Sequence, residues 1–501
     1  MKYDIYSYVI ATVILCSSCY KDKNNYNVEA INEAKITMEA DSFSVMQLSE
    51  LILSPEVKSS LHESDSYTYE WKIFGEKAKM STTDAAAYSE VLANTKDLKE
   101  TITTPPGKYT LLYTVTNRTN GVKSFKDIKL TVNSGFYQGL VVGYEKENRA
   151  ELGFIRADNE VRYELIHTLN EKSELNGKLQ SVNTLIVGLL KQMAVTTSTN
   201  TYLIDVDDFS VLKDKNSLFN TAPEDFMNSY LGGNKLYYNY DAPSDVYYIN
   251  HGKVYADMGP DFGGSMAGMY SQAFYYAGGA YNLFPFLFNG DNGADIYFYD
   301  NLNGKFLKTG FNQRSLSDVS FVKDVDKFDP TKVKKTAISA MLGYDNKVYY
   351  IMQDGNAYYI YTMLQYKGNI ASEAKLVNLA KVPEFAQARI FDARSDQQDI
   401  YYVVQNKLYL YNLASNAARV VLTLGDGEDI AGIHVYRSNM WQNSTDTNFN
   451  KRIYIATNKG DQGKVYQYGI LADGSLSSNA EKEFNGFGKI VSITYRNPNE
   501  K

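Results

Sequence analysis

Residues 399–412 read DIYYVVQNKLYLYN, two runs of strand-forming residues on either side of Gln405 and Asn406. Tyr, Val, Ile and Leu favour strands in such runs, and a two-residue link between them is typical of a β-hairpin. A second copy, KVYYIMQDGNAYYIY at 347–361, turns at Gly355. Most of the chain's 43 tyrosines fall in pairs of this kind, so strand preference explains them without any ligand.

The hairpin pattern recurs through the stretch from 135 to 496. Weaker copies stand at 150–167, 193–206, 245–257, 294–311 and 452–471, which makes seven with the two above. Radial four-stranded blades protect the strand edges that one flat sheet would expose. With about 52 residues per repeat, we expect a seven-bladed β-propeller over 135–501. A series of sandwiches or two smaller barrels is the alternative.

The last strand of this region, 488–496, has no successor in the repeat. It is therefore expected to join the sheet of the first blade and to close the ring.

A separate all-β domain is predicted over residues 34–134. Its strand signals are short, and Tyr67, Tyr69, Trp71 and Ile73 alternate along one of them, so they face the same way. Trp71 is expected in the core. About 100 residues with a central tryptophan fit an immunoglobulin-like β-sandwich.

Three motifs of this domain resemble the PKD-like family of immunoglobulin-type domains. They are the strand around Tyr69–Trp71, the turn Pro106-Gly107-Lys108-Tyr109, and the strand 113–117 that follows. Pro-Gly-x-Tyr before a strand also occurs in fibronectin-like modules. The resemblance implies a spacer domain and brings no catalytic residues with it.

The amino terminus carries an apolar run, 6–18, that is too short to span a bilayer and has the length of a signal-peptide core. It ends in Leu15-Cys16-Ser17-Ser18-Cys19, which resembles the lipobox of bacterial lipoproteins, although Cys16 stands where leucine is usual. The resemblance implies a signal peptide over 1–18, lipidation of Cys19, and a polar tether over 19–33. A signal peptide with two incidental cysteines, or a disulfide between them, is the alternative.

The composition argues against several classes of function. A net charge of −7 leaves no positive field for a nucleic acid. The four histidines have no short spacing, and the sequence lacks the zinc-protease, nucleophile-elbow and P-loop motifs. We therefore predict no catalytic residue, no metal and no cofactor. His434 is expected as a satisfied strand histidine.

Two acidic clusters, Asp205-Val206-Asp207-Asp208 and Asp291 with Asp295, lie next to predicted hairpins. Asp, Asn and Gly are ordinary turn residues, so turns are the favoured interpretation and a Ca²⁺ site is the alternative.

Two stretches could present aromatic side chains to a ligand or partner. The Gly-rich stretch 259–290 contains Tyr275, Tyr276 and Tyr281, and the polar insertion 437–451 contains Trp441. The competing interpretation is that aromatic residues of the first stretch, Phe284, Phe286 and Phe288 above all, fill the core.

A lipobox, an Asn- and Lys-rich tether and a PKD-like domain in this order resemble surface lipoproteins of Bacteroides-type bacteria that accompany SusC/SusD-like nutrient importers. The resemblance implies an outer-membrane, lipid-anchored protein facing the cell exterior. It would contact the importer subunits and bind or present oligosaccharides or peptides. The alternatives are a pure scaffold of the importer, or a propeller enzyme that cleaves glycans with paired carboxylates.

Overall fold

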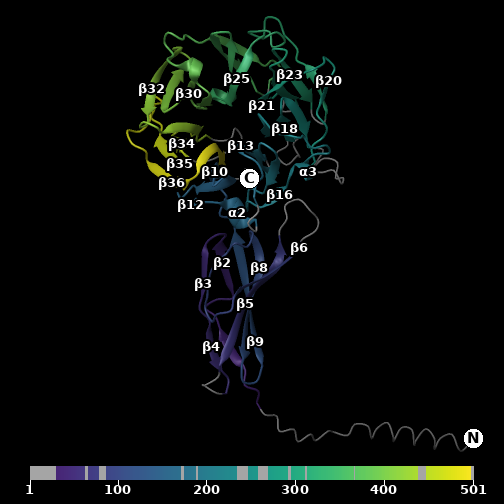
Figure 1. The fold of residues 1–501 in the computed structure, drawn as a ribbon, viewed down its shortest axis with the longest axis vertical. Coiled ribbons are helices and arrows are strands. Elements are labelled where there is room, and N and C mark those ends of the chain that lie inside the picture. Colours follow the sequence, from purple (N-terminus) through teal and green to yellow (C-terminus); the bar gives the residue numbers. More distant parts are fainter. Residues whose placement is uncertain are drawn as a thin grey trace, which may run out of the picture. The chain divides into compact units, whose positions relative to one another are not determined.

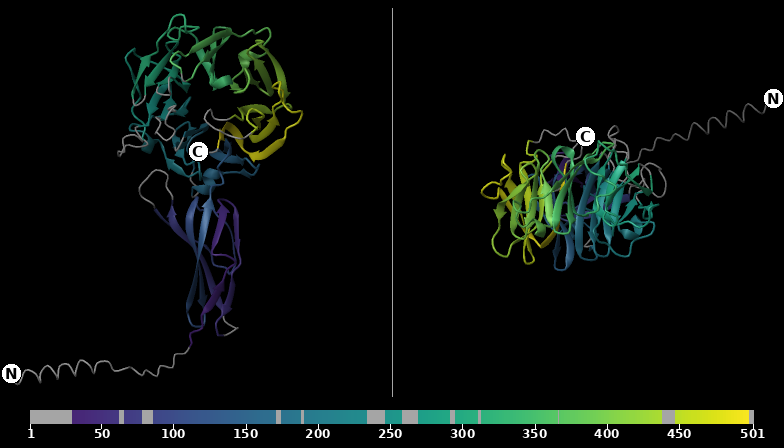
Figure 2. Two further views of the ribbon diagram at one scale, coloured as in Figure 1. Left: turned by 180° about the vertical axis from the view of Figure 1, so that it is seen from behind. Right: turned by 90° about the horizontal axis from the view of Figure 1, so that it is seen from above.

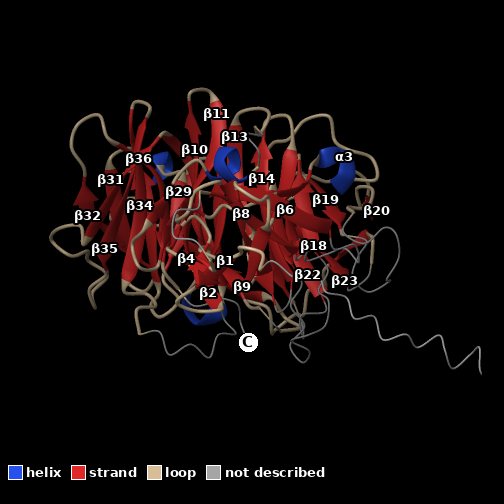
Figure 3. Ribbon diagram, turned by 90° about the horizontal axis from the view of Figure 1, so that it is seen from below, coloured by secondary structure: helices blue, strands red, loops and turns tan. Residues whose placement is uncertain are grey.

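A computed structural model describes residues 30–61, 66–77, 86–170, 174–187, 190–233, 246–257, 269–290, 295–310, 313–365, 367–437 and 447–497. These residues form two compact units. The first ends at Val132, and the second runs from Asn133 and includes the short segments Met46–Leu48 and Thr103–Pro106. Strands dominate both units (Figure 3). No helix in the described part of the chain is long and apolar enough to cross a bilayer.

The first unit has the layers of a β-sandwich. One sheet has the order β2-β9-β8-β5-β6, and two smaller sheets pair β1 with β4 and β3 with β7. Side chains from all three sheets share one core. The strands are β1 (Ala34–Thr37), β2 (Ser42–Met46), β3 (Glu50–Leu53), β4 (Glu56–Ser59), β5 (Tyr67–Lys77), β6 (Ala86–Ala93), β7 (Leu98–Thr101), β8 (Gly107–Asn117) and β9 (Lys123–Asn133).

Trp71 lies at the centre of that core, as its place in the alternating strand predicts. Its side chain is fully buried, and its indole nitrogen donates a 3.0 Å hydrogen bond to the Thr95 carbonyl. The indole stacks on Tyr113 with ring centroids 4.2 Å apart. A buried tryptophan needs such a partner for its N–H group, and here the backbone supplies it.

The second unit is propeller-like. Its sheets are arranged in a ring, which Figures 1 and 2 show from opposite sides. Strands that follow one another in the chain form most of each sheet, while β37 joins β10 and β20 joins β24. The sheets are β12-β11-β10-β37, β13-β14-β15-β16, β17-β18-β19, β20-β24-β23-β22-β21, β25-β26-β27-β28, β29-β30-β31-β32 and β33-β34-β35-β36.

The bounds of these strands follow the predicted repeats: β10 (Gly139–Lys146), β11 (Arg149–Arg156), β12 (Val161–Arg162), β13 (Leu179–Val187), β14 (Leu190–Thr197), β15 (Thr201–Ile204), β16 (Val211–Lys213), β17 (Tyr230–Gly233), β18 (Val246–Asn250), β19 (Lys253–Ala256), β20 (Tyr275–Tyr276), β21 (Leu283–Asn289), β22 (Asp295–Asp300), β23 (Lys305–Gly310), β24 (Ser315–Asp318), β25 (Thr336–Leu342), β26 (Val348–Asp354), β27 (Ala357–Met363), β28 (Ala371–Leu376), β29 (Ile390–Ala393), β30 (Asp399–Val404), β31 (Lys407–Asn412), β32 (Ala417–Thr423), β33 (Asp429–Val435), β34 (Arg452–Lys459), β35 (Gln462–Gly469), β36 (Lys482–Phe487) and β37 (Lys489–Arg496). The short helices are α2 (Leu165–Leu169), α3 (Lys215–Leu218), η3 (Tyr344–Asn346) and η4 (Phe385–Gln387).

One strand of each sheet faces the centre of the ring. These inner strands contact one another in the order β37, β13, β17, β21, β25, β29, β33, and β33 contacts β37 again. The predicted pairing of the last strand with the first sheet is confirmed, because β37 pairs antiparallel with β10 and places Tyr495 opposite Leu140. The end of the chain thus completes the sheet in which the unit begins.

The structure contains the two hairpins predicted at 347–361 and 399–412. β30 and β31 turn at Gln405, whose φ is 51°, and β26 and β27 turn at Gly355, whose φ is 58°. Their paired tyrosines are buried between sheets, and burial raises the pKa of Tyr349 to about 12. Packing between sheets therefore accounts for these tyrosines.

Candidate functional site

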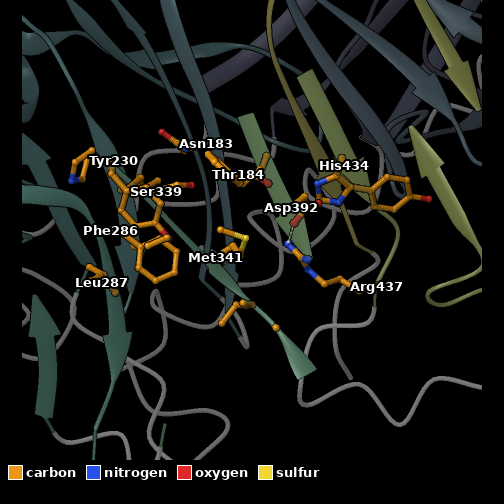
Figure 4. A pocket seen from close by; sticks show the side chains of 18 of the residues that line it. Asn183, Thr184, Tyr230, Phe286, Leu287, Ser339, Met341, Asp392, His434 and Arg437 are labelled. Atoms are coloured by element: carbon orange, nitrogen blue, oxygen red, sulfur yellow. Dashed lines mark ion pairs between the residues drawn. The ribbon is translucent and has the colours of Figure 1, made fainter. Parts of the chain in front are cut away.

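A cavity of about 660 Å³ lies at the centre of the second unit (Figure 4). This volume is within the usual range for small-molecule sites. Each inner strand supplies part of its wall, so the site combines residues from every sheet of the ring. Its side chains include Asn183, Thr184, Tyr230, Phe284, Phe286, Ser339, Phe391, Asp392, His434, Arg437, Tyr495 and Asn497.

One side of the cavity is apolar and aromatic. Phe284 and Tyr230 are half-buried, and Phe286 packs on Tyr230 with ring centroids 5.5 Å apart. The pairing of β21 with β22 shifts between Leu283 and Leu287, which is a bulge around Pro285. Proline has no N–H for the ladder, and a bulge turns side chains away from strict alternation. This local break brings Phe284, Pro285 and Phe286 together onto the wall.

The opposite side carries an ion pair between neighbouring inner strands. Asp392 on β29 lies 2.7 Å from the Arg437 guanidinium, just after β33. The Asp392 carboxylate also accepts hydrogen bonds from the backbone N–H groups of Ala393 (2.9 Å) and Val435 (2.7 Å). Arg437 donates a further hydrogen bond to the Ala393 carbonyl. Both charged groups are thus held in place by the protein itself.

His434 stands beside this pair on β33. Its ring lies parallel to that of Tyr495, with centroids 6.0 Å apart. Burial lowers its pKa to about 4, a shift that the nearby Asp392 charge opposes and the Arg437 charge assists. The imidazole is therefore neutral near pH 7. The expected strand position is found, but the structure adds that this histidine faces the cavity.

Two amide side chains on the wall have an incomplete set of hydrogen bonds. The Oδ1 atoms of Asn183 and Asn497 are buried and have no hydrogen-bond partner in the described part of the chain. A buried acceptor without a partner costs about 1–3 kcal/mol. A ligand hydroxyl that reached either oxygen would recover part of this cost.

The predicted aromatic surface differs from what the structure shows. Tyr276 and Tyr281 are each only 5% exposed, and their hydroxyls donate to Asp318 and to the Phe274 carbonyl, both at 2.8 Å. They pack in the core, so neither offers a free ring. Tyr275 is 70% exposed, but it does not line the central cavity. Alternation along β20 sends the two neighbouring tyrosines in opposite directions.

Of the three phenylalanines predicted for the core, one lies in the core and two line the cavity. Phe288 is 1% exposed and fills the core, whereas Phe284 and Phe286 line the cavity. Trp441 and Cys19 lie outside the described residues, so their predicted roles stay predictions.

The acidic cluster after β15 forms a turn, as its composition predicts. The Asp205 carboxylate accepts from the Asp207 N–H at 2.7 Å, and Asp208 accepts from the Ser210 N–H at 2.9 Å. Among the described residues, no three side chains of metal-binding type come together. Asp295 pairs with Lys308 at 2.7 Å, and Asp291 lies outside the described residues.

The sequence interpretation missed Tyr230, Asp392 and Arg437. Each stands on or just after an inner strand, in a different repeat, and no local motif marks it. Aligning the repeats by the strand that precedes each predicted hairpin would have collected these positions, because β17, β29 and β33 precede their hairpins and face the centre.

Comparison with known proteins agrees with this architecture. Residues 19–179 match the model of the PKD-like family. A solved quinonprotein alcohol dehydrogenase-like protein of Bacteroides thetaiotaomicron is similar over 92% of this chain and 99% of its own, with 13% identity and a TM-score of 0.52. No curated protein matches the sequence.

More distant similarity extends to two other solved structures. The β-propeller domain of Cps50 (Swd1) from Myceliophteria thermophila is 8% identical over 62% of this chain and 88% of its own, with a TM-score of 0.35. The extracellular domain of a one-component system of B. thetaiotaomicron is 7% identical over 90% and 69%, with the same score of 0.35. The family match thus gives a PKD-like segment, and the first solved structure shares the overall fold of this chain.

Proposed function

We propose that this chain is a lipid-anchored outer-membrane protein facing the cell exterior, whose second unit is a seven-bladed β-propeller that binds an oligosaccharide or peptide nutrient. The central cavity carries the proposal. It has the volume of a small-molecule site, and it places an aromatic wall opposite a fixed polar one. Binding sites need this combination of contact area and orienting groups.

The number of blades is supported by the sheets. The described strands from β10 to β37 fall into seven sheets, and their inner strands contact one another in a cycle. A sheet shared by the first and last strands is a common way to close such a ring, since it leaves no free edge between the ends.

Binding is favoured over glycan cleavage by the charges of the cavity. Glycoside hydrolysis usually needs two carboxylates, one of them an acid or base near neutral pH. Asp392 is the one carboxylate among the described residues of the wall, and it is held in an ion pair. This pair can orient a ligand, and the described wall supplies no second carboxylate to act with it.

The cell address and the partner rest on the amino-terminal resemblance. A lipid on Cys19 would anchor the chain, and the PKD-like segment would act as a spacer beside a SusC/SusD-like importer. A purely structural role in the importer complex is the competing proposal, and it predicts no ligand in the cavity.

The test is equilibrium binding of the detergent-solubilised full chain to panels of defined oligosaccharides and short peptides. Ser339→Trp, on the cavity wall, should fill the space and abolish binding, whereas Tyr275→Ala, exposed and outside the cavity, should leave it unchanged. Thermal unfolding of both variants checks their folding, and Phe284→Ala is a second cavity variant. Binding that ignores both cavity variants would contradict the proposal. Gentle affinity purification from membranes tests the importer contact separately.

A further inference from the structure

We infer that the central cavity is built for an uncharged, hydroxyl-rich ligand, a neutral oligosaccharide rather than a charged glycan or a short peptide. The inference rests on the proposed binding function and names its ligand class. It is drawn from the balance of charge on the cavity wall and from the groups that remain free to contact a ligand.

The described residues of the wall carry no net charge. Among the described residues that line the cavity, Asp392 and Arg437 are the ionised side chains, and they lie 2.7 Å apart. The third titratable group of this side, His434, is neutral near pH 7 because burial disfavours its protonated form. The field of each charge on a bound molecule is therefore largely cancelled by the other.

The pair is also occupied by hydrogen bonds from the protein. The Asp392 carboxylate has its Arg437 contact and two backbone donors, and the Arg437 guanidinium bonds both Asp392 and the Ala393 carbonyl. A ligand carboxylate near Arg437 or a ligand ammonium near Asp392 would also meet the opposite member of the pair 2.7 Å away, and its repulsion offsets much of the attraction.

Uncharged groups, in contrast, find free partners on the wall. Tyr230, Phe284 and Phe391 are only partly buried and line the cavity, so they offer a ligand apolar contact area. In the described part of the chain the Oδ1 atoms of Asn183 and Asn497 have no hydrogen-bond partner, and a ligand hydroxyl that reached them would supply one. A sugar ring offers both kinds of surface, since its C–H faces pack on aromatic rings and its hydroxyls donate and accept.

A short peptide fits this wall less well. Its two charged termini would enter a cavity of about 660 Å³ together with the backbone, and the described part of the wall offers neither of them an opposite charge outside the Asp392–Arg437 pair. The same argument applies to uronic acids and amino sugars.

The experiment compares three size-matched panels by calorimetry on the detergent-solubilised full chain: neutral oligosaccharides of two to six units, the corresponding uronic-acid and glucosamine oligomers, and di- to tetrapeptides with free termini. We expect neutral oligosaccharides to bind at least tenfold more tightly than any charged member. Asp392→Asn should leave Arg437 unpaired and raise affinity for uronic-acid oligomers at least fivefold. Arg437→Gln should do the same for glucosamine oligomers.

The outcomes separate this inference from the proposed function. Tighter binding of charged glycans or peptides, abolished by Ser339→Trp, would overturn the neutral-ligand inference and leave the binding function intact. No binding by any panel, or binding insensitive to Ser339→Trp and Phe284→Ala, would overturn both. Tyr275→Ala is the control that should behave as the unmodified chain. If one of the two charge variants fails to fold, the other still tests whether removing one charge of the pair raises affinity for oligomers of the opposite charge to the one that remains.

Discussion

The guanidinium of Arg496 joins three segments of the second unit. Its side chain is 1% exposed, lies 2.5 Å from the Asp207 carboxylate, and donates to the carbonyls of Phe136 and Val206. Burial lowers the pKa of this arginine, and the Asp207 charge opposes that shift. A residue at the end of the chain thus holds both the entry into the unit and the turn after β15.

Replacing Arg496 by alanine should lower the free energy of unfolding by about 3–5 kcal/mol, because buried carbonyls and a carboxylate lose their donor. Denaturant unfolding followed by circular dichroism measures this loss. Lys464→Ala is the control, since its pair with Glu483 at 2.8 Å is exposed and should cost less than about 1 kcal/mol. Equal effects of the two substitutions would show that Arg496 does not stabilise the unit.

Glu151 makes stability depend on pH. It is 2% exposed, and its carboxylate accepts from the Ile166 N–H at 3.2 Å. Burial raises its pKa from 4.5 to about 7, against the opposing effect of backbone hydrogen bonds. Between pH 4.5 and about 7, the Glu151 carboxyl of the folded chain keeps a proton that the same group has lost in the unfolded chain. The free energy of unfolding therefore falls as pH rises through this window.

Glu151→Gln should flatten the stability profile between pH 5 and 8, with a difference from the unmodified chain on the order of 2–3 kcal/mol across the window. Urea unfolding at several pH values measures it. The matched control is Glu164→Gln, because Lys146 lowers the pKa of Glu164 and its contribution is lost only at lower pH. Parallel profiles for Glu151→Gln and the unmodified chain would refute this assignment.

Strand β37 is the element on which the ring depends. It pairs with β10 along its length and, as an inner strand, contacts both β13 and β33. Removing it would expose the edge of β10 and open the cycle of inner strands, which would leave apolar surface unpaired on two sheets. It also carries Tyr495, so the cavity wall would lose part of one side.

A chain ending at Phe487 should therefore lose the cooperative unfolding of the second unit, or unfold roughly 10 °C lower or more. The control chain ends at Asn497, keeps β37, and should unfold as the full chain does. Differential scanning calorimetry compares the three chains. An unchanged transition after removal of β37 would contradict its role in closing the ring.

In strand β21 the alternation of side chains is interrupted, and the interruption shapes the wall of the cavity. Alternating phenylalanines at 284, 286 and 288 predict one shared face, and the bulge around Pro285 breaks this rule. Phe288 remains in the core while Phe284 meets the cavity. The alternation was readable from the sequence, but the bulge depends on how β21 pairs with β22.

For the complete chain, a lipid on Cys19 is the proposed attachment to the membrane. Cys19→Ala should abolish incorporation of labelled palmitate and release the chain from the membrane fraction, because it removes the thiol that would carry the proposed lipid. Cys16→Ala should keep both label and membrane association. Label retained in Cys19→Ala would refute lipidation at this position.

Much of the architecture can be predicted from the sequence, because hairpin pairing and the buried face of a strand both depend on residues that are close together in the chain. Paired runs around Gln405 and Gly355 predict hairpins, alternation predicts the burial of Trp71, and a final strand without a successor predicts its pairing with the first. Side-chain alternation and turn chemistry act over a few residues, so they are visible without a structure.

The binding site could not be predicted in the same way. Asp392 and Arg437 are 45 positions apart in the sequence, and Tyr230 is farther from both. They line one cavity because the inner strands of their sheets lie around the same centre. Exposure also depends on packing, as the buried Tyr276 beside the exposed Tyr275 shows. The chain's local pattern therefore dictates its strands and their order. Which side chains meet, and whether their charges cancel, follows from closure of the inner strands around a common axis.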